Sequence, residues 1–547
     1  MDKQEKPQAR YAPGAGVWLV LGVLILFHVI INGITLSFDE GYPVYDGCNF
    51  FERAVSIAHS LETGIYSNDE LHTVSDPPLV DTVYGLMVCL AGYNLDAIAC
   101  SNALFMILLV YGLYHLCRRL INRRAGIIAC VLCLAAPGLV GHSRILWHEY
   151  ALTAFVVVSF TFLLRTEQFT RIPFVVAFCL ATAAGCLTRI TFPLYVFVPF
   201  LVYVVYSLVS CRGRRYKQLM LMAGAIGGVV LMIGWWYYPS FLHTVSRYKT
   251  FFVAKQTETF RQMVFQVLYY YSNRNLFVPL TLVAILSLPF FFYAAWAQFE
   301  KKMVLLMIII PIFAMFVFPL QSGFASSRWL LPTVPFIIIS IVQMIEKIKT
   351  KRIRVVVYSF LIGCVYLQFA FCQFGYANVF RSDFVRQALD KNKSLSMVYE
   401  PEQGKLYARH DPYQSRAIVR LIEERRRNPS GRILFLADVS NLLSYMHYSN
   451  ITGQPALEIN EPLGPLKEFP ADTGTYDIDE NFSDVEFVVY LKNWEKISSD
   501  VQQYYSTDLI PYMLKRFKSE MKHYNTLVEI KGELGTTIVI AQKTVDD

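Results

Sequence analysis

The sequence predicts a polytopic α-helical membrane protein that ends in a soluble domain of α/β or α+β type. Hydrophobic residues make up 54% of its 547 residues and charged residues only 17%, against about 45–50% and 25% in soluble domains. A water-soluble chain this apolar would expose more apolar surface than solubility allows. Long apolar runs recur up to residue 374, and the remaining 170 or so residues contain none.

The apolar runs are long enough to cross a bilayer, which takes about 20 residues of helix. We predict about eleven transmembrane helices. They lie near residues 16–36, 98–117, 125–141, 150–164, 172–188, 193–210, 218–238, 277–297, 303–319, 330–346 and 355–374. The first run is too long for a signal peptide, and no small-residue cleavage site follows it.

Lysine and arginine predict the orientation of these spans, because they accumulate in cytoplasmic loops. Up to residue 375, the loops on the side of the N-terminus carry 20 Lys and Arg, whereas the opposite loops carry nine. We therefore expect a multi-pass protein of the inner (cytoplasmic) membrane. Its N-terminus is expected in the cytoplasm, and the domain after residue 375 outside it.

The sequence divides into residues 1–375, the transmembrane domain, and residues 376–547, the extracytoplasmic domain. In the second part, residues 432–439, 485–491 and 536–541 are typical of buried strands, and residues 414–427 and 498–522 of helices. All eleven cysteines lie at or before Cys372, so we expect no disulfide framework in this domain.

The net charge of +8 does not indicate a nucleic-acid partner. Residues 1–375 carry +12 and residues 376–547 carry −4, so the excess mainly follows the membrane orientation. The chain also has no P-loop, G-x-S-x-G or HExxH motif, and therefore no sign of NTP hydrolysis, serine hydrolysis or zinc proteolysis. No metal site is predicted, since the CxxC of Cys130 and Cys133 lies in an apolar run without a second pair. A divalent metal in the acidic first loop remains open.

The first exterior loop, residues 37–97, holds ten of the seventeen acidic residues that precede position 375, with Arg53 as its single base. Asp39 and Glu40 directly follow the first span, so we expect them at the membrane surface, near the depth of a lipid phosphate. The alternative is that they only cap a helix, which carboxylates stabilise by about 0.3–1 kcal/mol.

Three other exterior turns place an arginine beside a span, against the positive-inside tendency. These residues are Arg144, Arg189 and Arg328, and Glu149 follows the first of them. Snorkelling to the interface is the alternative for each. The loop 239–276 adds Arg247 and Lys249, among other bases, and would alternatively lie as an amphipathic segment on anionic lipid.

A carboxylate pair and several guanidinium groups at one membrane surface suit group transfer from a phosphate-linked lipid. The carboxylate would take a proton from an acceptor hydroxyl. Arginines would hold the phosphate and stabilise it as a leaving group.

Five segments, in this order, make the chain resemble the GT-C membrane glycosyltransferases. Within them it resembles the branch of the protein O-mannosyltransferases and the bacterial aminoarabinose transferase of lipid A. The segments are FDEGYPVYDGCNFFERAVSIAHSLETGIYS from Phe38, SDPPLVDTVYGLM from Ser75, GHSRILWHEYALTAFVVVSF from Gly141, GCLTRITFP from Gly185 and SSRWLLPTVPFIII from Ser326. The resemblance covers roughly residues 15–375.

This resemblance implies roles for individual residues. Asp39 would be the catalytic base with Glu40 as its neighbour, and Arg144 and Arg328 would bind donor phosphate or balance charge. Glu149 stands where the family usually has Asp, and Arg189 where it has Lys; both keep the charge but change the reach.

The function expected from these features is transfer of a sugar from a polyprenyl-phosphate-linked donor to a lipid, glycan or protein acceptor in the cell envelope. The resemblance implies a hexosyl- or pentosyltransferase that inverts the anomeric centre. Membrane lipids are the remaining expected partners, and no cofactor is firmly implied. Two alternatives stay open: an oligosaccharyltransferase that moves a whole glycan to protein, and a non-enzymatic flippase or transporter of lipid-linked sugars.

Overall fold

The computed structural model describes the chain in several stretches. They are residues 15–37, 46–64, 77–210, 215–240, 264–265, 267–268, 270–317, 327–374, 421–422, 424–425, 432–436, 485–492, 521–531 and 537–544. The chain divides into two compact units, residues 1–38 with 53–408 and residues 39–52 with 409–547. The domain boundary after residue 375 stays a prediction, because residues 375–420 lie outside these stretches.

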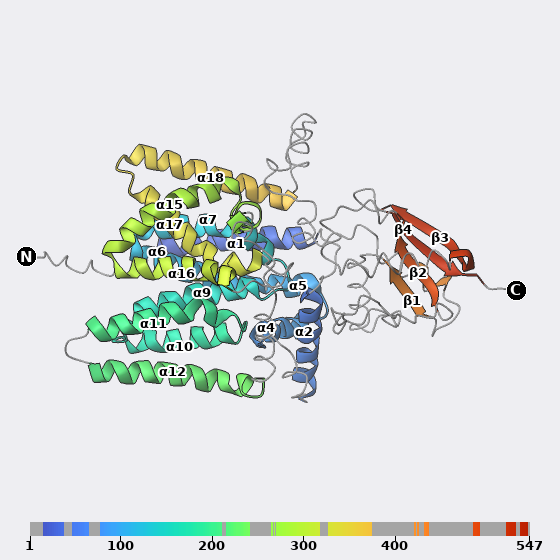
Figure 1. The fold of residues 1–547 in the computed structure, drawn as a ribbon, viewed down its shortest axis with the longest axis horizontal. Coiled ribbons are helices and arrows are strands. Elements are labelled where there is room, and N and C mark those ends of the chain that lie inside the picture. The colour runs from blue at the N-terminus through green and yellow to red at the C-terminus, as the bar shows by residue number, and fades with distance from the viewer. Residues whose placement is uncertain are drawn as a thin grey trace, which may run out of the picture. The chain divides into compact units, whose positions relative to one another are not determined.

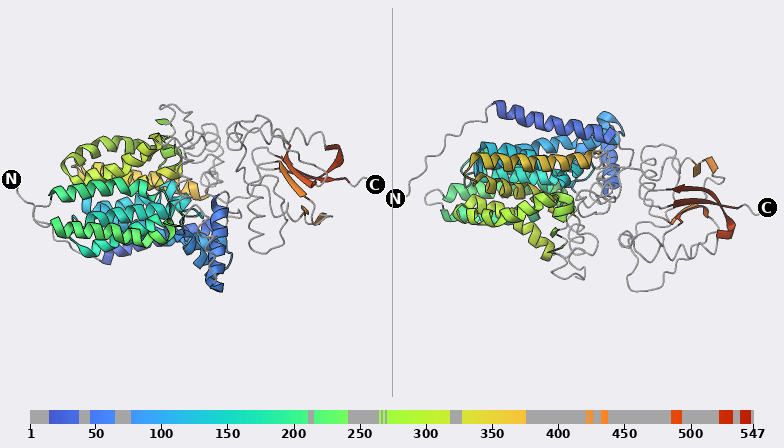
Figure 2. Two further views of the ribbon diagram at one scale, coloured as in Figure 1. Left: turned by 60° about the horizontal axis from the view of Figure 1, so that its bottom comes forward. Right: turned by 90° about the horizontal axis from the view of Figure 1, so that it is seen from above.

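The first unit is a bundle of long helices that run roughly along a common direction (Figures 1 and 2). Its long helices are α1 (Ala15–Ser37), α6 (Asn102–Leu120), α7 (Arg123–Leu134), α9 (Glu149–Arg165), α10 (Ile172–Cys186), α11 (Phe192–Ser210), α12 (Arg215–Tyr237), α15 (Val278–Ala297), α16 (Phe299–Val317), α17 (Val334–Glu346) and α18 (Lys351–Phe374). Each predicted span overlaps one of these helices. The prediction of a polytopic helical membrane protein is therefore confirmed.

The exact number of spans stays a prediction. Seven helical segments in the described part of the chain are both long and apolar enough to cross a membrane. Helices α9 and α10 have only 17 and 15 residues. The span predicted at 125–141 is divided between α7 and the short α8 (Pro137–His142).

The break between α7 and α8 has a local cause in the sequence. A proline disfavours helical backbone in the residue before it, and Ala136 before Pro137 is extended, with φ −66° and ψ 128°. Pro137 then occupies the first turn of α8, where its missing N–H costs nothing. The break ends the span early and starts the turn that leads into α9.

Shorter elements lie at the end of the bundle where α9 begins. In the loop predicted at 37–97 the structure has α2 (Asp46–Thr63), α4 (Leu79–Ala91) and α5 (Leu95–Cys100), which the sequence analysis did not predict as helices. Figure 1 shows α2 crossing the direction of the long helices. The π-helix η1 (Tyr270–Asn275) and the 3₁₀ helix η2 (Ser327–Thr333) contact α8, so they lie at this end too.

Close helix contacts make the centre of the bundle, and apolar side chains cover its outside. Gly112 of α6 lies against α9, where an added Cβ would come within 3.0 Å of Val158. Small residues at such crossings let helix backbones approach closely. Outer side chains such as Leu231 and Tyr293 are 82% and 85% exposed, as expected of a surface that faces lipid.

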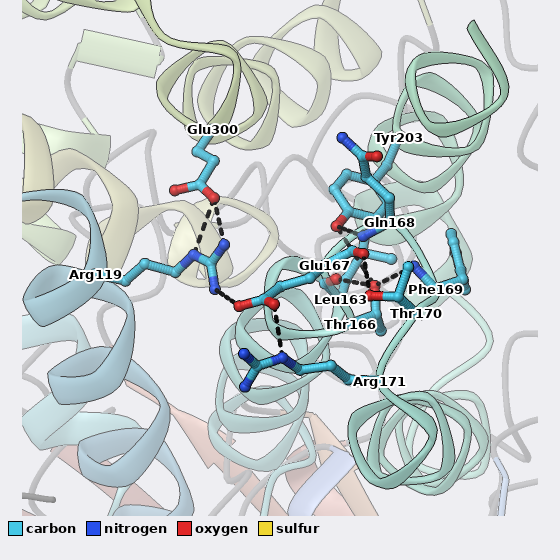
Figure 3. A network of polar contacts seen from close by, with 10 residues as sticks. All are labelled: Arg119, Leu163, Thr166, Glu167, Gln168, Phe169, Thr170, Arg171, Tyr203 and Glu300. Carbon is cyan, nitrogen blue, oxygen red and sulfur yellow. Dashed lines mark hydrogen bonds and ion pairs between the residues drawn. The ribbon is translucent and has the colours of Figure 1, made fainter. Parts of the chain in front are cut away.

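At the opposite end, a polar network joins α6, α16 and the connection between α9 and α10 (Figure 3). Arg119 of α6 donates to Glu300 of α16, with Nε 3.0 Å from Oε1, and also pairs with Glu167. Glu167 pairs in turn with Arg171. These side chains are partly exposed, so each pair adds at most about 1 kcal/mol.

The connection between α9 and α10 has a left-handed backbone. Glu167, Gln168 and Phe169 have φ values of 49°, 60° and 61°, a conformation that is costly for residues with a Cβ. The main chain compensates, because the N–H of Gln168 donates to the Tyr203 hydroxyl and its carbonyl accepts from Gln218. The strained turn thus connects α9 and α10 to α11 and α12.

The second unit contains a four-stranded sheet in the order β1-β2-β4-β3. Its strands are β1 (Arg432–Leu436), β2 (Val485–Leu491), β3 (Tyr524–Lys531) and β4 (Thr537–Lys543). β1 and β2 are parallel, whereas β4 is antiparallel to both β2 and β3. The sheet confirms the three predicted strands, and β3 was not predicted.

Of the two helices predicted in this domain, only short parts lie within the described residues. Residues 421–422 and 424–425, inside the predicted helix 414–427, are helical. The predicted helix 498–522 lies almost wholly outside them, and its last two residues belong to the 3₁₀ turn Met521–His523.

We expect Gln168→Gly to stabilise the protein by about 0.5–1 kcal/mol. Glycine removes the left-handed strain, about 1–2 kcal/mol, and loses part of that gain to its greater freedom in the unfolded chain. The main-chain bonds of residue 168 remain. The midpoint of thermal unfolding in detergent should rise by about 1–2 °C. Gln168→Val is the matched control, and a lower midpoint for the glycine variant than for the wild type would contradict the prediction.

Candidate functional site

Glu149, the first residue of α9, is the centre of a buried charge cluster. Only 2% of the residue is exposed. Its Oε1 lies 3.2 Å from Nη1 of Arg189 and 3.7 Å from Nε of Arg328. The three residues come from separate parts of the chain, namely the start of α9, the turn between α10 and α11, and η2. The fold rather than local sequence therefore brings them together.

The charges explain how a carboxylate can be buried here. Burial by itself raises the pKa of Glu149, but the guanidinium groups of Arg189 and Arg328 outweigh it, so the pKa lies below its usual value of 4.5. Glu149 is therefore ionised at neutral pH. Its second oxygen, Oε2, is buried and has no hydrogen-bond partner among the residues that the structure describes.

Aromatic rings and the backbone hold Arg328 beside the carboxylate. Its guanidinium carbon lies 5.3 Å from the centre of the half-buried Trp147 ring, within the range of a cation–π contact. The next residue, Trp329, is fixed through its carbonyl, which accepts from the Tyr195 hydroxyl at 2.7 Å. At the end of η2, the hydroxyls of Thr333 and Tyr271 are 2.6 Å apart. These contacts place the 3₁₀ turn against α11 and η1.

His142 packs edge-to-face against Trp147, with ring centres 5.6 Å apart. Its Nδ1–H donates to the carbonyl of Gly138 at 2.8 Å. Burial, together with Arg328 and Arg189, lowers the pKa of His142 although Glu149 opposes the shift. The histidine is therefore neutral at physiological pH and adds no charge to the cluster.

Arg144 is buried, with 2% of the residue exposed, and is held by the first helix. Its Nε donates to Oδ1 of Asn32 at 3.0 Å, and the Asn32 amide donates to the Ser143 hydroxyl at 2.8 Å. Sequence reasoning missed Asn32. The available signal was a single amide in an otherwise apolar run, since such groups in a span usually face the interior of the bundle.

Asp81, in the first turn of α4, is a second buried carboxylate. Its Oδ2 lies 2.7 Å from Nη2 of Arg53, and its Oδ1 lies 2.8 Å from Nε2 of His148. Asp81 and His148 are both fully buried. From the sequence, Asp81 and Arg53 are predicted only as charges of the acidic loop, and the segment PPLVD is the signal that could single out Asp81.

The predicted site residues therefore fall into three groups. Glu149, Arg189 and Arg328 come together, and Arg144 lies on the contact with α1. Asp39, Glu40, Arg247 and Lys249 lie outside the residues that the structure describes. Within those residues no group of three or more His, Cys, Asp and Glu side chains could hold a metal ion.

Comparison with known proteins connects this arrangement to a fold. Residues 75–238 match the family described as dolichyl-phosphate-mannose-protein mannosyltransferase. Over 96% of this chain and 98% of the other, the structure is similar to that of ArnT from Cupriavidus metallidurans in the apo state, with a TM-score of 0.55 and 15% identity. The chain has the fold of the GT-C membrane glycosyltransferases.

Two further solved structures are similar. ArnT from Cupriavidus metallidurans bound to undecaprenyl phosphate has a TM-score of 0.53 and 15% identity over 96% of this chain and 98% of that one. The oligosaccharyltransferase of Archaeoglobus fulgidus has a TM-score of 0.48 and 12% identity over 85% of this chain and 67% of that one. A search of curated protein sequences found no match.

The GT-C resemblance predicted from sequence motifs is thus confirmed, and the matched segment contains part of the charge cluster. Residues 75–238 include Asp81, Arg144, Glu149 and Arg189, whereas Arg328 comes from outside this segment. Arg328 reaches Glu149 because η2, which carries it, packs against α9.

We expect Glu149→Gln to lower the free energy of unfolding by about 3–5 kcal/mol, because it leaves two guanidinium groups, only 11% and 14% exposed, facing a neutral amide. The pKa of Glu149 is lowered in the folded state. Its contribution is therefore complete above the usual carboxyl pKa and is lost as the pH falls through the folded value. The difference in melting temperature between wild type and variant, measured in detergent, should stay constant from about pH 6 to 8 and shrink below about pH 4. A difference independent of pH down to pH 3 would contradict this assignment.

Proposed function

We propose that the chain is an integral-membrane glycosyltransferase that takes its sugar from a polyprenyl-phosphate-linked donor. The observation that carries the proposal is the cluster in which two guanidinium groups converge on buried Glu149 at one end of an apolar bundle. The GT-C fold supports it, as does the solved relative of the same fold that is bound to undecaprenyl phosphate.

Phosphate chemistry accounts for the arginines. In the donor, phosphate joins sugar and lipid and carries one negative charge; when the sugar leaves, the lipid phosphate carries two. Groups that stabilise the second charge lower the barrier to transfer. Arg189 and Arg328 offer planar donors suited to phosphate oxygens, and Glu149 orients them before the donor binds.

The proposed transfer needs a base on the acceptor side. The acceptor oxygen forms a bond to the anomeric carbon while the bond from that carbon to the phosphate oxygen breaks, and its electron pair goes to the phosphate. The acceptor proton goes to a carboxylate, which we assign to Asp39 with Glu40 beside it. Attack from the face opposite the phosphate inverts the anomeric centre.

The finer features of the proposal come from the sequence. We propose a hexosyl- or pentosyltransferase that acts on a lipid, glycan or protein acceptor at the outer face of the cytoplasmic membrane, with a cytoplasmic N-terminus. The charge asymmetry of the loops supports this orientation. Arg144, Arg247 and Lys249 are proposed as further groups that balance charge near the donor phosphate.

The two alternatives are not favoured. A transporter of lipid-linked sugars would be expected to hold its charges near the middle of the membrane, whereas Glu149, Arg189 and Arg328 lie in turns where helices begin or end. An oligosaccharyltransferase would be expected to recognise its acceptor through a WWD-type motif, and Trp494 is the only tryptophan after Trp329.

We expect Arg328→Gln to reduce sugar transfer by about 10²–10³-fold, the usual cost of removing one donor that stabilises charge in the transition state. The measurement is transfer from radiolabelled undecaprenyl-phosphate-linked sugars to envelope components in proteoliposomes. Binding of undecaprenyl phosphate should weaken as well. Arg171→Gln, which breaks an ion pair at the other end of the bundle, is the control and should leave transfer unchanged.

Asp39→Asn should abolish transfer from the same donors and leave binding of undecaprenyl phosphate within about twofold, because the base acts on the acceptor and not on the lipid phosphate. Full transfer by the Asn variant would overturn the assignment of the base. Movement of the lipid-linked sugar across the proteoliposome membrane, with no acceptor modified, would favour transport instead.

A further inference from the structure

We propose that Asp81 is a positioning residue, which acts through His148 to hold Glu149 and Arg189 in place for the donor phosphate. The inference rests on the proposed function and deepens it. It starts from a fully buried carboxylate that the proposed transfer does not use directly.

The first contact fixes the residue before Glu149. Oδ1 of Asp81 accepts from Nε2 of His148 at 2.8 Å, and neither side chain is exposed. Because His148 directly precedes Glu149, this bond restrains the peptide at the start of α9. Asp81 also lies in the first turn of α4, where the positive end of the helix dipole favours a carboxylate.

The second contact joins α4 to the turn of Arg189. The N–H of Leu79, the first residue of α4, donates to the carbonyl of Leu187 at 2.9 Å. Leu187 is two residues before Arg189. One helix therefore contacts both turns whose side chains form the Glu149–Arg189 pair.

Further hydrogen bonds hold the turn before α9 in the same position. The Tyr84 hydroxyl, one turn after Asp81, donates to Oδ1 of Asn102 at 3.1 Å and lies 3.4 Å from the Trp147 carbonyl. The Asn102 amide donates to the Ile145 carbonyl at 3.1 Å. The carbonyls of Ile145 and Trp147, in the irregular backbone before Glu149, are thus contacted by side chains of α4 and α6, and Asp81 adds a charged contact to His148.

The cost of burying Asp81 supports a role in positioning the groups around it. A buried carboxylate is costly unless it is paired, and well-packed apolar residues are often as stable as a buried ion pair. Each oxygen of Asp81 pairs with a different side chain, Oδ2 with Arg53 and Oδ1 with His148. Asp81 therefore fixes the orientation of the His148 side chain. A displacement of about 1 Å at a catalytic group can cost about 10²-fold in rate. Loss of Asp81 should therefore slow turnover, in addition to the stability that is lost when one partner of a buried pair is removed.

The experiment compares two replacements of His148. In His148→Gln the amide nitrogen can still donate to Asp81, whereas in His148→Phe the ring remains and the donor is lost. We expect the Gln variant to keep kcat within about threefold and the Phe variant to lose about 10²-fold, with KM for an undecaprenyl-phosphate-linked sugar changed by less than about threefold. Asp81→Asn should resemble His148→Phe, and the double variant should lose no more than either single one.

Each outcome decides the inference. Equal turnover in His148→Phe and wild type, equal loss in His148→Gln and His148→Phe, or additive losses in the double variant would overturn it. If Asp81→Asn does not fold, as judged by its melting temperature, the two His148 variants decide alone. Arg354→Gln, which breaks a pair with Glu346 at the other end of the bundle, is the control and should keep wild-type turnover.

The failure of the inference can be distinguished from failure of the proposed function. A wild-type protein that neither binds undecaprenyl phosphate nor transfers sugar from it overturns both. A wild type that does both, with His148→Phe unchanged, overturns the positioning role and leaves the proposed function standing.

Discussion

The cost of burying charge at the end of an apolar bundle is the constraint on which the site depends. A carboxylate removed from water is tolerated only when cations and hydrogen-bond donors replace the solvent. Glu149 meets this condition through Arg189 and Arg328, and Asp81 through Arg53 and His148. Because these partners come from different helices and turns, the pairing of each carboxylate also determines how those elements are placed relative to one another.

The paired charged side chains at the two ends of the bundle differ in their exposure to solvent. Around Glu167 the paired side chains are about one quarter or more exposed, so water shares their solvation and each pair contributes little. Around Glu149 the acidic side chain is 3% exposed, and each cation is needed. In such a site the position of each arginine side chain is fixed before a ligand binds. This is the preorganisation that stabilising a leaving phosphate requires.

Much of the fold could be predicted from hydrophobic pattern, because each span must be apolar over most of its length whatever it packs against. The predictions were weakest where polar and apolar residues mix. Helix α2 and strand β3 were missed, since their patterns depend on which face is covered. In the site, Glu149, Arg189 and Arg328 could be selected because a charge beside a span is unusual. Asn32 and His148 were missed because nothing in their immediate sequence indicates the partner.

The sequence by itself determined that the chain spans a membrane, where its apolar helices lie, and which charged residues stand beside them. It did so because hydrophobicity and local charge are properties of contiguous residues. Only the tertiary structure decided which of those charges meet. Glu149 and Arg328 are separated by 179 positions in the sequence, and their distance in space depends on how α9 packs against η2. The pairing of Asp81 with His148 likewise depends on where α4 lies at the end of the bundle.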